Sequence, residues 1–334
     1  MSPFGLQGRA FLSVPVLRCY NPWDERRAAS MGRVCFVFLD GVGLGPDDGA
    51  NPLALVPMPH VRDLIGGGLV AGREVRTQGL LFRPLDACLG VEGLPQSATG
   101  QTALFTGVNA PAAVGMHVSA YPTAALRALI MAHSLLKRAR EMGRRATFAN
   151  AYSDRYWELV EQRKLRHSAT TLTNMAASLP FRTLADLERG DAVYWDIVHL
   201  SIRERLGLDW PLLPPEEAGR RLAGLANAHD LVLYESFLPD LVGHRRIPLP
   251  YSYLLDLVDR FLGSVVTRLA SDVSLVVCSD HGNIEDPRTR GHTYNPVPLL
   301  VVGPAAMSFT EAAAITDVTP AILNVLADGS GGGP

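Results

Sequence analysis

The sequence predicts an α/β fold, in which a doubly wound, mostly parallel sheet carries an inserted smaller cap domain. Three observations predict it: short runs that are apolar at almost every position, helical patterns between those runs, and a middle segment of different character. Runs of this kind are typical of strands that are buried on both faces of a parallel sheet. Their alternation with helices favours a sheet that is covered by helices on both sides.

The strand-like runs each end in polar or glycine-rich residues, which mark the loops that follow them. These runs cover residues 33–40, 230–236, 273–279 and 297–303. A long amphipathic helix is expected over 250–270, and a last helix over 317–327, with Pro320 in its first turn.

The strands divide the chain into a core and an insertion. Residues 31–111 and 229–328 are expected to form the α/β core, and 112–228, with its arginine-rich amphipathic stretches, the cap. The alternative is that these stretches are crossover helices of one larger sheet. Residues 1–30 are expected to be a disordered extension, with translation starting at Met1 or at Met31, and the glycine-rich 329–334 a flexible tail.

Composition limits the partners of the chain. Among 334 residues, 31 are Lys or Arg and 33 are Asp or Glu, so no overall charge attracts nucleic acid or an anionic membrane. The cysteines form no CxxC pair, and no segment reads as a signal peptide or a membrane span. We therefore expect a cytoplasmic protein that binds a small molecule, with neither nucleic acid nor a membrane as a partner; the oligomeric state stays open.

Acidic and imidazole side chains stand at the ends of several predicted strands. In open α/β sheets, ligands bind beyond the carboxyl ends of the strands, so these side chains are expected to meet. Each alone is more often a helix cap or a turn residue, but together their carboxylates need cations. A mixed set of nitrogen and oxygen ligands suits Mn²⁺ or Zn²⁺. The candidate metal ligands are Asp40, Asp240, His244, Asp280, His281 and His292.

A strand-to-helix turn presents Ser97 within the stretch SATGQ. The N-terminus of a helix directs free N–H groups and a partial positive charge outward, so a phosphate group can dock there beside Ser97. The alternative is that Ser97 is a plain N-cap, and Thr99 is a competing hydroxyl. The glycines of DGVGLG do not have the spacing of a dinucleotide site, and Ser97 is not in the sequence context of a formylglycine sulfatase.

The segments LDGVG, SATG, PDLVGH, SDHGN and GHT, in this order, resemble the alkaline phosphatase superfamily of metalloenzymes. Within it the chain is most similar to the branch of cofactor-independent phosphoglycerate mutase and phosphopentomutase. The match covers roughly residues 33–112 and 230–328 and leaves out the middle of the chain.

The resemblance implies two divalent ions, with Mn²⁺ expected and Zn²⁺ as the alternative. It implies that one ion is held by Asp240, His244 and His292. It implies that the other is held by Asp40, Asp280 and His281, with the Ser97 oxygen as a further ligand.

Two departures limit the resemblance. Gln101 stands where the phosphoglycerate mutase motif has a histidine, and the middle segment is much shorter than the cap of that family, so phosphoglycerate is not implied as the substrate. The GHRR stretch resembles phosphopentomutase, although the spacing of Asp240 and His244 is that of the phosphoglycerate mutases. The candidate substrate contacts are Thr99, Gln101, Arg245 and Arg246, the arginines being equally well explained as a solvated turn.

The predicted function is that of a two-metal phosphomutase or phosphomonoesterase acting on a small phosphorylated metabolite. Ser97 is the predicted nucleophile and forms a phosphoserine intermediate, which passes its phosphoryl group to water or to another hydroxyl. A phosphodiesterase of the same superfamily and a catalytically inactive metal-binding member are the alternatives.

Overall fold

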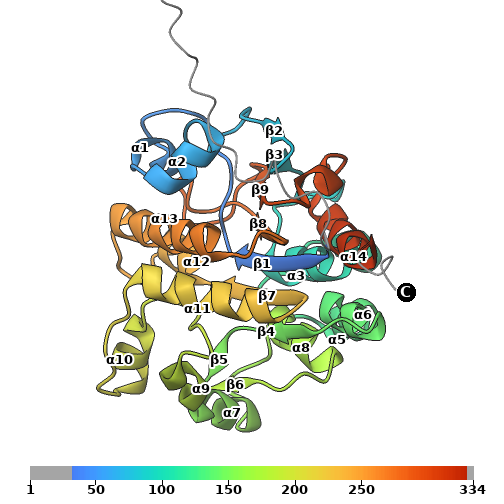
Figure 1. Cartoon of the computed structure of the whole chain (residues 1–334), viewed down its shortest axis with the longest axis vertical. Coiled ribbons are helices and arrows are strands. Elements are labelled where there is room, and N and C mark those ends of the chain that lie inside the picture. Colours follow the sequence, from blue (N-terminus) through green and yellow to red (C-terminus); the bar gives the residue numbers. More distant parts are fainter. Residues whose placement is uncertain (1–31, 329–334) are drawn as a thin grey trace, which may run out of the picture.

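A seven-stranded sheet lies at the centre of the molecule, in a computed structural model that describes residues 32–328 (Figure 1). The predictions for residues 1–30 and 329–334, and for the start at Met31, lie outside the described residues. The strand order is β2-β3-β9-β8-β1-β7-β4. The strands are β1 (Arg33–Leu39), β2 (Val75–Thr77), β3 (Leu80–Leu85), β4 (Ala146–Phe148), β7 (Leu231–Ser236), β8 (Val273–Cys278) and β9 (Val297–Val302).

Strands β8, β1, β7 and β4 are parallel neighbours, whereas β9 is antiparallel to both β8 and β3. The predicted runs at 33–40, 230–236, 273–279 and 297–303 correspond to β1, β7, β8 and β9. The predicted fold class, α/β with a mostly parallel sheet, is therefore confirmed.

Helices cover both faces of the sheet (Figure 1). Side chains alternate along β1, so that Phe36 and Phe38 face one helical layer and Cys35 and Val37 face the other. The first layer contains α3 (Ser97–Thr106), α4 (Ala110–Val114), α5 (Ala124–His133), α6 (Leu135–Glu141), α8 (Ala169–Ala176), α14 (Val318–Asp328) and the short turns η1 (Ala306–Phe309) and η2 (Ile315–Asp317). The second contains α1 (Pro52–Leu55), α2 (Pro59–Ile65), α11 (Pro215–Ala228), α12 (Leu238–Gly243) and α13 (Tyr251–Arg268).

A smaller lobe lies beyond β4, in the lower part of Figure 1. It holds the two-stranded sheet of β5 (Ala151–Tyr152) and β6 (Arg182–Thr183), together with α7 (Asp154–Glu161), α9 (Leu184–Arg189) and α10 (Leu200–Leu206). Its own apolar cluster includes Leu187, Tyr194 and Ile202.

The segment predicted as the cap, residues 112–228, contributes to the main sheet as well as to the smaller lobe. Strand β4 pairs with β7 and extends the main sheet, and helices α5, α6, α8 and α11 pack on the two faces of that sheet. The apolar faces of these helices are buried against strands, which the amphipathic pattern alone did not reveal. The middle segment therefore supplies helices of the main sheet as well as the smaller lobe, and the division into core and cap stays a prediction.

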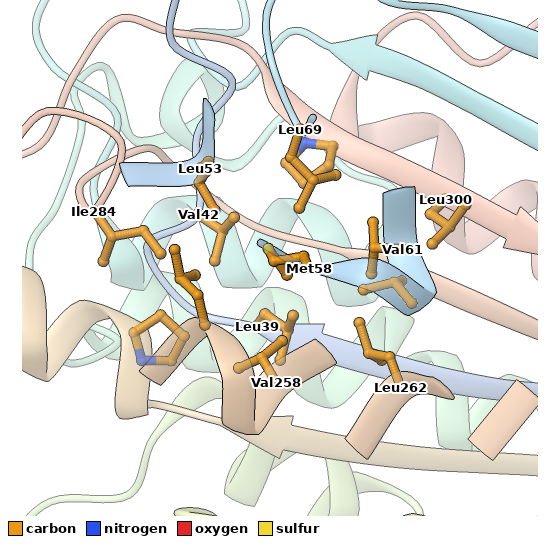
Figure 2. Close-up of a pocket in the computed structure, with 14 residues that line it drawn as sticks. Leu39, Val42, Leu53, Met58, Val61, Leu69, Val258, Leu262, Ile284 and Leu300 are labelled. Carbon is orange, nitrogen blue, oxygen red and sulfur yellow. The ribbon is translucent and has the colours of Figure 1, made fainter. Parts of the chain in front are cut away.

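An apolar cavity of about 30 Å³ lies under the loops that leave β1, β7 and β8 (Figure 2). Leu39, Pro239 and Ile284, which line it, are neighbours in sequence of Asp40, Asp240 and Asn283. The lining side chains are all apolar, so the cavity lacks the polar partners that hold an ordered water. It is a packing defect of the core and not a ligand site.

Met58 projects into the middle of this region and is only 2% exposed (Figure 2). We expect Met58→Ala to lower the free energy of unfolding by roughly 2–5 kcal/mol, because the substitution enlarges an existing cavity. Denaturant unfolding measures the change. The control is Met131→Ala on α5, where the side chain is 45% exposed and the expected change is within about 0.5 kcal/mol. Equal losses in the two variants would contradict the role of Met58 in the core.

Candidate metal centre and active site

The ends of three adjacent parallel strands deliver the predicted ligands to one place. Asp40 follows β1, and its backbone N–H donates to the carbonyl oxygen of Ser236 at the end of β7. Strand β7 leads into α12, which carries Asp240 and ends next to His244. Asp280 and His281 follow β8, and the loop between β8 and β9 returns with His292. The carboxyl ends of parallel strands share one edge of the sheet, so the predicted ligands converge there.

The first ligand group is formed by Asp240, His244 and His292. The Asp240 Oδ1 lies 3.3 Å from His244 Nε2 and 3.7 Å from His292 Nε2, and the two imidazole nitrogens are 3.2 Å apart. Ligand atoms bound at about 2.1 Å to a tetrahedral ion lie about 3.4 Å from one another. The spacing of these three atoms therefore fits one divalent ion.

The two histidines of this group are oriented by backbone carbonyls. His244 Nδ1 lies 2.6 Å from the carbonyl oxygen of Arg290, and His292 Nδ1 lies 2.7 Å from that of Pro95. A hydrogen bond donated through Nδ1 leaves the Nε2 lone pair free for a metal. Burial and the neighbouring His281 lower the pKa of His292 to about 4, so this ring is neutral at pH 7, the form that binds metals.

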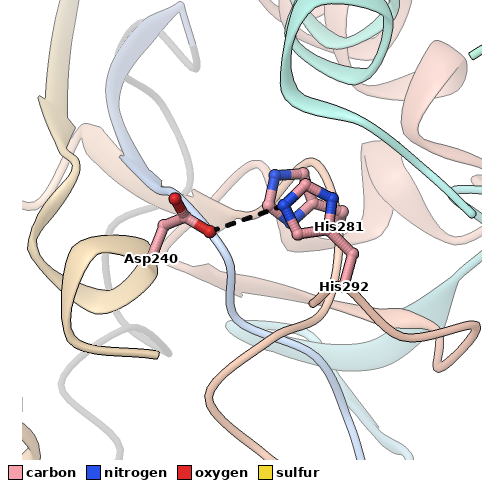
Figure 3. A group of neighbouring side chains, drawn as sticks. All are labelled: Asp240, His281 and His292. Atoms are coloured by element: carbon pink, nitrogen blue, oxygen red, sulfur yellow. Dashed lines mark ion pairs between the residues drawn. The ribbon is translucent and has the colours of Figure 1, made fainter. Parts of the chain in front are cut away.

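The second ligand group is formed by Asp40, Asp280 and His281. His281 Nε2 lies 3.3 Å from Asp40 Oδ1 and 3.5 Å from Asp280 Oδ2. His281 also connects the two groups, because its ring stacks on that of His292 with centroids 3.6 Å apart. It lies with Asp240 and His292 in a further cluster, in which the ligand atoms are all within 4.8 Å of one another (Figure 3).

Buried carboxylate oxygens that accept no hydrogen bond support a cation site in the second group. Both carboxylate oxygens of Asp280 and the Oδ1 of Asp40 are buried and accept no hydrogen bond within residues 32–328. Burial raises the pKa of Asp40 well above its usual range, and repulsion from Asp280 adds to this rise. Burial also raises the pKa of Asp280. Paired carboxylates in such a position need a cation to compensate their charge, and the donor set fits a divalent ion.

Ser97 begins α3 and directs its hydroxyl to the second group. Its Oγ lies 2.9 Å from His281 Nε2. No side chain caps α3, so the first turn of this helix is available to an anion. Gly100 allows the helix to approach the ligand loop, because a Cβ at this position would lie 2.8 Å from the carbonyl oxygen of Asp280. A larger residue there would displace Ser97 from the ligands.

Sequence reasoning missed two residues that hold the ligand loops. Asn283 donates from Nδ2 to Asp240 Oδ1 over 2.9 Å. Glu285 accepts hydrogen bonds from the backbone N–H groups of Gly43 and Asn283 and from the side chain of Thr293, so it joins the loop after β1 to the loop that carries His292. The stretch SDHGNIED contained the signal, since both residues follow the ligands Asp280 and His281 within five positions.

A cavity of about 360 Å³ opens beside the ligand groups. Asp40, Ser97, Gln101 and Asp240 line it, so the candidate nucleophile and both ligand groups face the same space. Gln101 also donates to Asp40 Oδ2 over 3.2 Å and thereby orients a candidate ligand. Of the predicted substrate contacts, Gln101 and Arg246 are at this cavity.

Thr99 and Arg245, the other two predicted substrate contacts, are not among the residues that line the cavity. The Thr99 hydroxyl is buried, donates to the carbonyl oxygen of Gln96 and accepts from the backbone N–H of Val118. Arg245 donates to the carbonyl oxygen of Pro287. Thr99 lies in α3 and Arg245 follows α12, and the spacing of the motifs could not reveal the direction of either side chain.

The comparisons with known proteins agree with this geometry. Residues 215–327 match the family model of the Metalloenzyme superfamily. This segment contains every candidate ligand except Asp40 and Ser97. The predicted resemblance is therefore confirmed by the match of residues 215–327.

The proteins to which the chain is similar include phosphoglycerate mutases. The 2,3-bisphosphoglycerate-independent phosphoglycerate mutase of Cereibacter sphaeroides is 31% identical over 120 residues, which cover 34% of this chain and 24% of that protein. The enzyme of the same name from Desulforudis audaxviator is 36% identical over 127 residues, which cover 34% and 25%. The matched part of the chain thus spans about a quarter of the length of these relatives.

Solved structures extend the likeness to most of the fold. The PH0037 protein from Pyrococcus horikoshii aligns with a TM-score of 0.55 and 14% identity, covering 92% of this chain and 100% of that one. Alkaline phosphatase from the Antarctic bacterium TAB5 aligns with a TM-score of 0.53 and 15% identity, covering 90% and 99%. At such low identity the likeness establishes the fold alone. The reaction of this chain must therefore be inferred from the residues of its site.

Proposed function

We propose that this chain is a two-metal phosphoryl-transfer enzyme, a phosphomutase or a phosphomonoesterase that acts on a small phosphorylated metabolite. The observation that carries the proposal is the position of Ser97, whose Oγ is 2.9 Å from His281 Nε2 and which lines the same cavity as Asp40 and Asp240. The names of the relatives, phosphoglycerate mutase and alkaline phosphatase, support the reaction class.

Two divalent ions fit the ligand groups, and we propose Mn²⁺, with Zn²⁺ as the alternative. Asp240, His244 and His292 would hold one ion, and Asp40, Asp280 and His281 the other, next to Ser97. Ions bound there would neutralise charge on the phosphoryl oxygens and favour the ionised form of the Ser97 hydroxyl.

Ser97 would act as the nucleophile. Its oxygen forms a bond to phosphorus while the ester P–O bond breaks, and the alcohol part of the substrate is released from the phosphoryl group. The resulting phosphoserine passes the phosphoryl group to water in a phosphatase, or to another hydroxyl of the bound substrate in a mutase. The first turn of α3 favours the negative charge that gathers on the phosphoryl oxygens.

Arginines in the cavity would hold the substrate. Arg166, Arg205 and Arg246 line the cavity, and no ion pair involves them within residues 32–328. The guanidinium of Arg166 lies 5.2 Å from the centre of the Tyr121 ring, and that of Arg205 lies 5.6 Å from the Trp195 ring. Stacking on these rings fixes Arg166 and Arg205 without neutralising their charge. Their N–H groups therefore remain available to anionic groups of a substrate.

The test uses the full chain loaded with Mn²⁺ or Zn²⁺ and a panel of phosphate monoesters and diesters. Release of inorganic phosphate from monoesters identifies a phosphatase, isomerised product without release identifies a mutase, and preference for diesters identifies a phosphodiesterase. Intact-mass analysis of rapidly quenched enzyme is expected to detect one added phosphoryl group, absent from Ser97→Ala. Metal binding without turnover of any ester would contradict the proposal and favour an inactive metal-binding member.

A further inference from the structure

One wall of the cavity beside Ser97 consists of hydroxyl groups and one buried carboxyl group. Tyr152, Tyr156, Ser168 and Thr171 line the cavity together with Glu235. The Thr171 Oγ1 lies 2.8 Å from the Tyr152 hydroxyl, 3.4 Å from that of Tyr156 and 2.9 Å from Ser168 Oγ. The wall is therefore a connected network of groups that can both donate and accept hydrogen bonds.

Glu235 is held rigidly in this wall. It lies near the end of β7 and is 2% exposed. The side chain of Asn150 clamps its backbone, with Nδ2 donating to the Glu235 carbonyl oxygen over 2.8 Å and Oδ1 accepting from its N–H over 3.0 Å. The hydroxyl of Thr170 donates to the Glu235 carboxyl group. A side chain fixed at both its backbone and its tip is suited to selecting a ligand.

No cation neutralises Glu235 among the ion pairs of the described residues. Burial raises the pKa of Glu235 to about 8, although the hydrogen bond from Thr170 opposes this rise. At pH 7 the carboxyl group is mainly protonated and can donate a hydrogen bond. The other ionisable groups that line the same cavity are Asp40, Tyr121, Arg166, Tyr194, Arg205, Asp240 and Arg246.

We propose that Glu235 determines which alcohol part of the substrate is accepted, and that its buried, cation-free carboxyl group favours a further hydroxyl over a carboxylate. A hydroxyl both donates to and accepts from the network around Glu235. A carboxylate placed against Glu235 could only accept hydrogen bonds, and it would repel the ionised form of the Glu235 carboxyl group. Sites built to hydrogen-bond a polar substrate group discriminate strongly against analogues that cannot make the bond. The inference rests on the proposed function and defines its substrate class.

The test compares glycerol 3-phosphate with 3-phosphoglycerate, which differ only in a hydroxymethyl group against a carboxylate. With Mn²⁺-loaded enzyme, kcat/KM is expected to be higher for glycerol 3-phosphate. Glu235→Leu is expected to reduce the ratio of the two kcat/KM values by about 10-fold or more. Glu235→Gln keeps a donor, so its ratio is expected to stay within about 3-fold of the wild type. Glu311→Gln, at an exposed position, is the control and should leave the ratio unchanged.

The pH profile separates a specific contact from a merely structural role. As pH rises through about 8, ionisation removes the donor of Glu235, so kcat/KM for glycerol 3-phosphate should fall in the wild type and not in Glu235→Gln. An unchanged ratio in both Glu235 variants, or a wild-type preference for 3-phosphoglycerate, would overturn the inference while the proposed function stands. Failure of the wild type to turn over any phosphate ester would overturn both.

Discussion

Ser97→Ala is expected to lower kcat/KM for the best phosphate ester by roughly 10³-fold or more, because the substitution removes the atom that attacks phosphorus. The variant should keep the fold and retain the bound metal. Ser97 is only partly buried, and within residues 32–328 its hydroxyl forms a side-chain hydrogen bond with His281 alone, so little packing is lost. Steady-state kinetics and metal analysis of the same preparation measure both quantities.

Thr99→Ala is the matched control for this substitution. It removes a hydroxyl two positions further along the same helix, where the group bonds to the backbone of Gln96 and Val118 and does not line the cavity. We expect it to reduce stability by about 1 kcal/mol. Its kcat/KM should stay within about 10-fold of the wild type, because the candidate nucleophile remains. A larger loss of turnover in Thr99→Ala than in Ser97→Ala would assign the nucleophile to the wrong hydroxyl.

Asp280→Asn is expected to remove the metal of the second ligand group and to lower kcat/KM by roughly 10²-fold or more. We expect Asp280→Asn to be more stable than the wild type without metal and less stable than the wild type with metal. Burial raises the pKa of Asp280, so at neutral pH its ionised form destabilises the metal-free fold. In the presence of a chelator, Asp280→Asn should therefore unfold at a higher temperature than the wild type. With saturating Mn²⁺ the wild type should gain more, because it binds the ion.

Asp259→Asn provides the control for a buried carboxylate without a metal role. Asp259 accepts hydrogen bonds from the backbone N–H groups of His60 and Val61 and so holds the start of α2. This substitution should lower the unfolding temperature to a similar extent with and without Mn²⁺ and leave the metal content unchanged. If Asp280→Asn instead destabilised the protein in the chelator as well, the carboxylate would be a structural acceptor.

The sequence predicted the strands that matter most for the site. Runs such as 33–40 and 273–279 are apolar throughout and end in Asp40 and Asp280, so both the strand and its polar end are local properties of the chain. Strand β4, at one edge of the sheet, was not predicted from the sequence. β4 is short, from Ala146 to Phe148, and its pairing with β7 depends on packing by α6 and α8, which local patterns do not encode.

By itself, the sequence determined the candidate ligands, their order along the chain and the α/β fold that brings strand ends together, because these depend on short-range patterns. Only the tertiary structure decided which polar side chains face the cavity. Arg246 and Gln101 line it while their near neighbours Arg245 and Thr99 do not, and Glu235 lies in its wall although its sequence context is simply that of a buried strand. The direction of a side chain depends on backbone geometry and on packing between distant segments, and spacing along the chain carries neither.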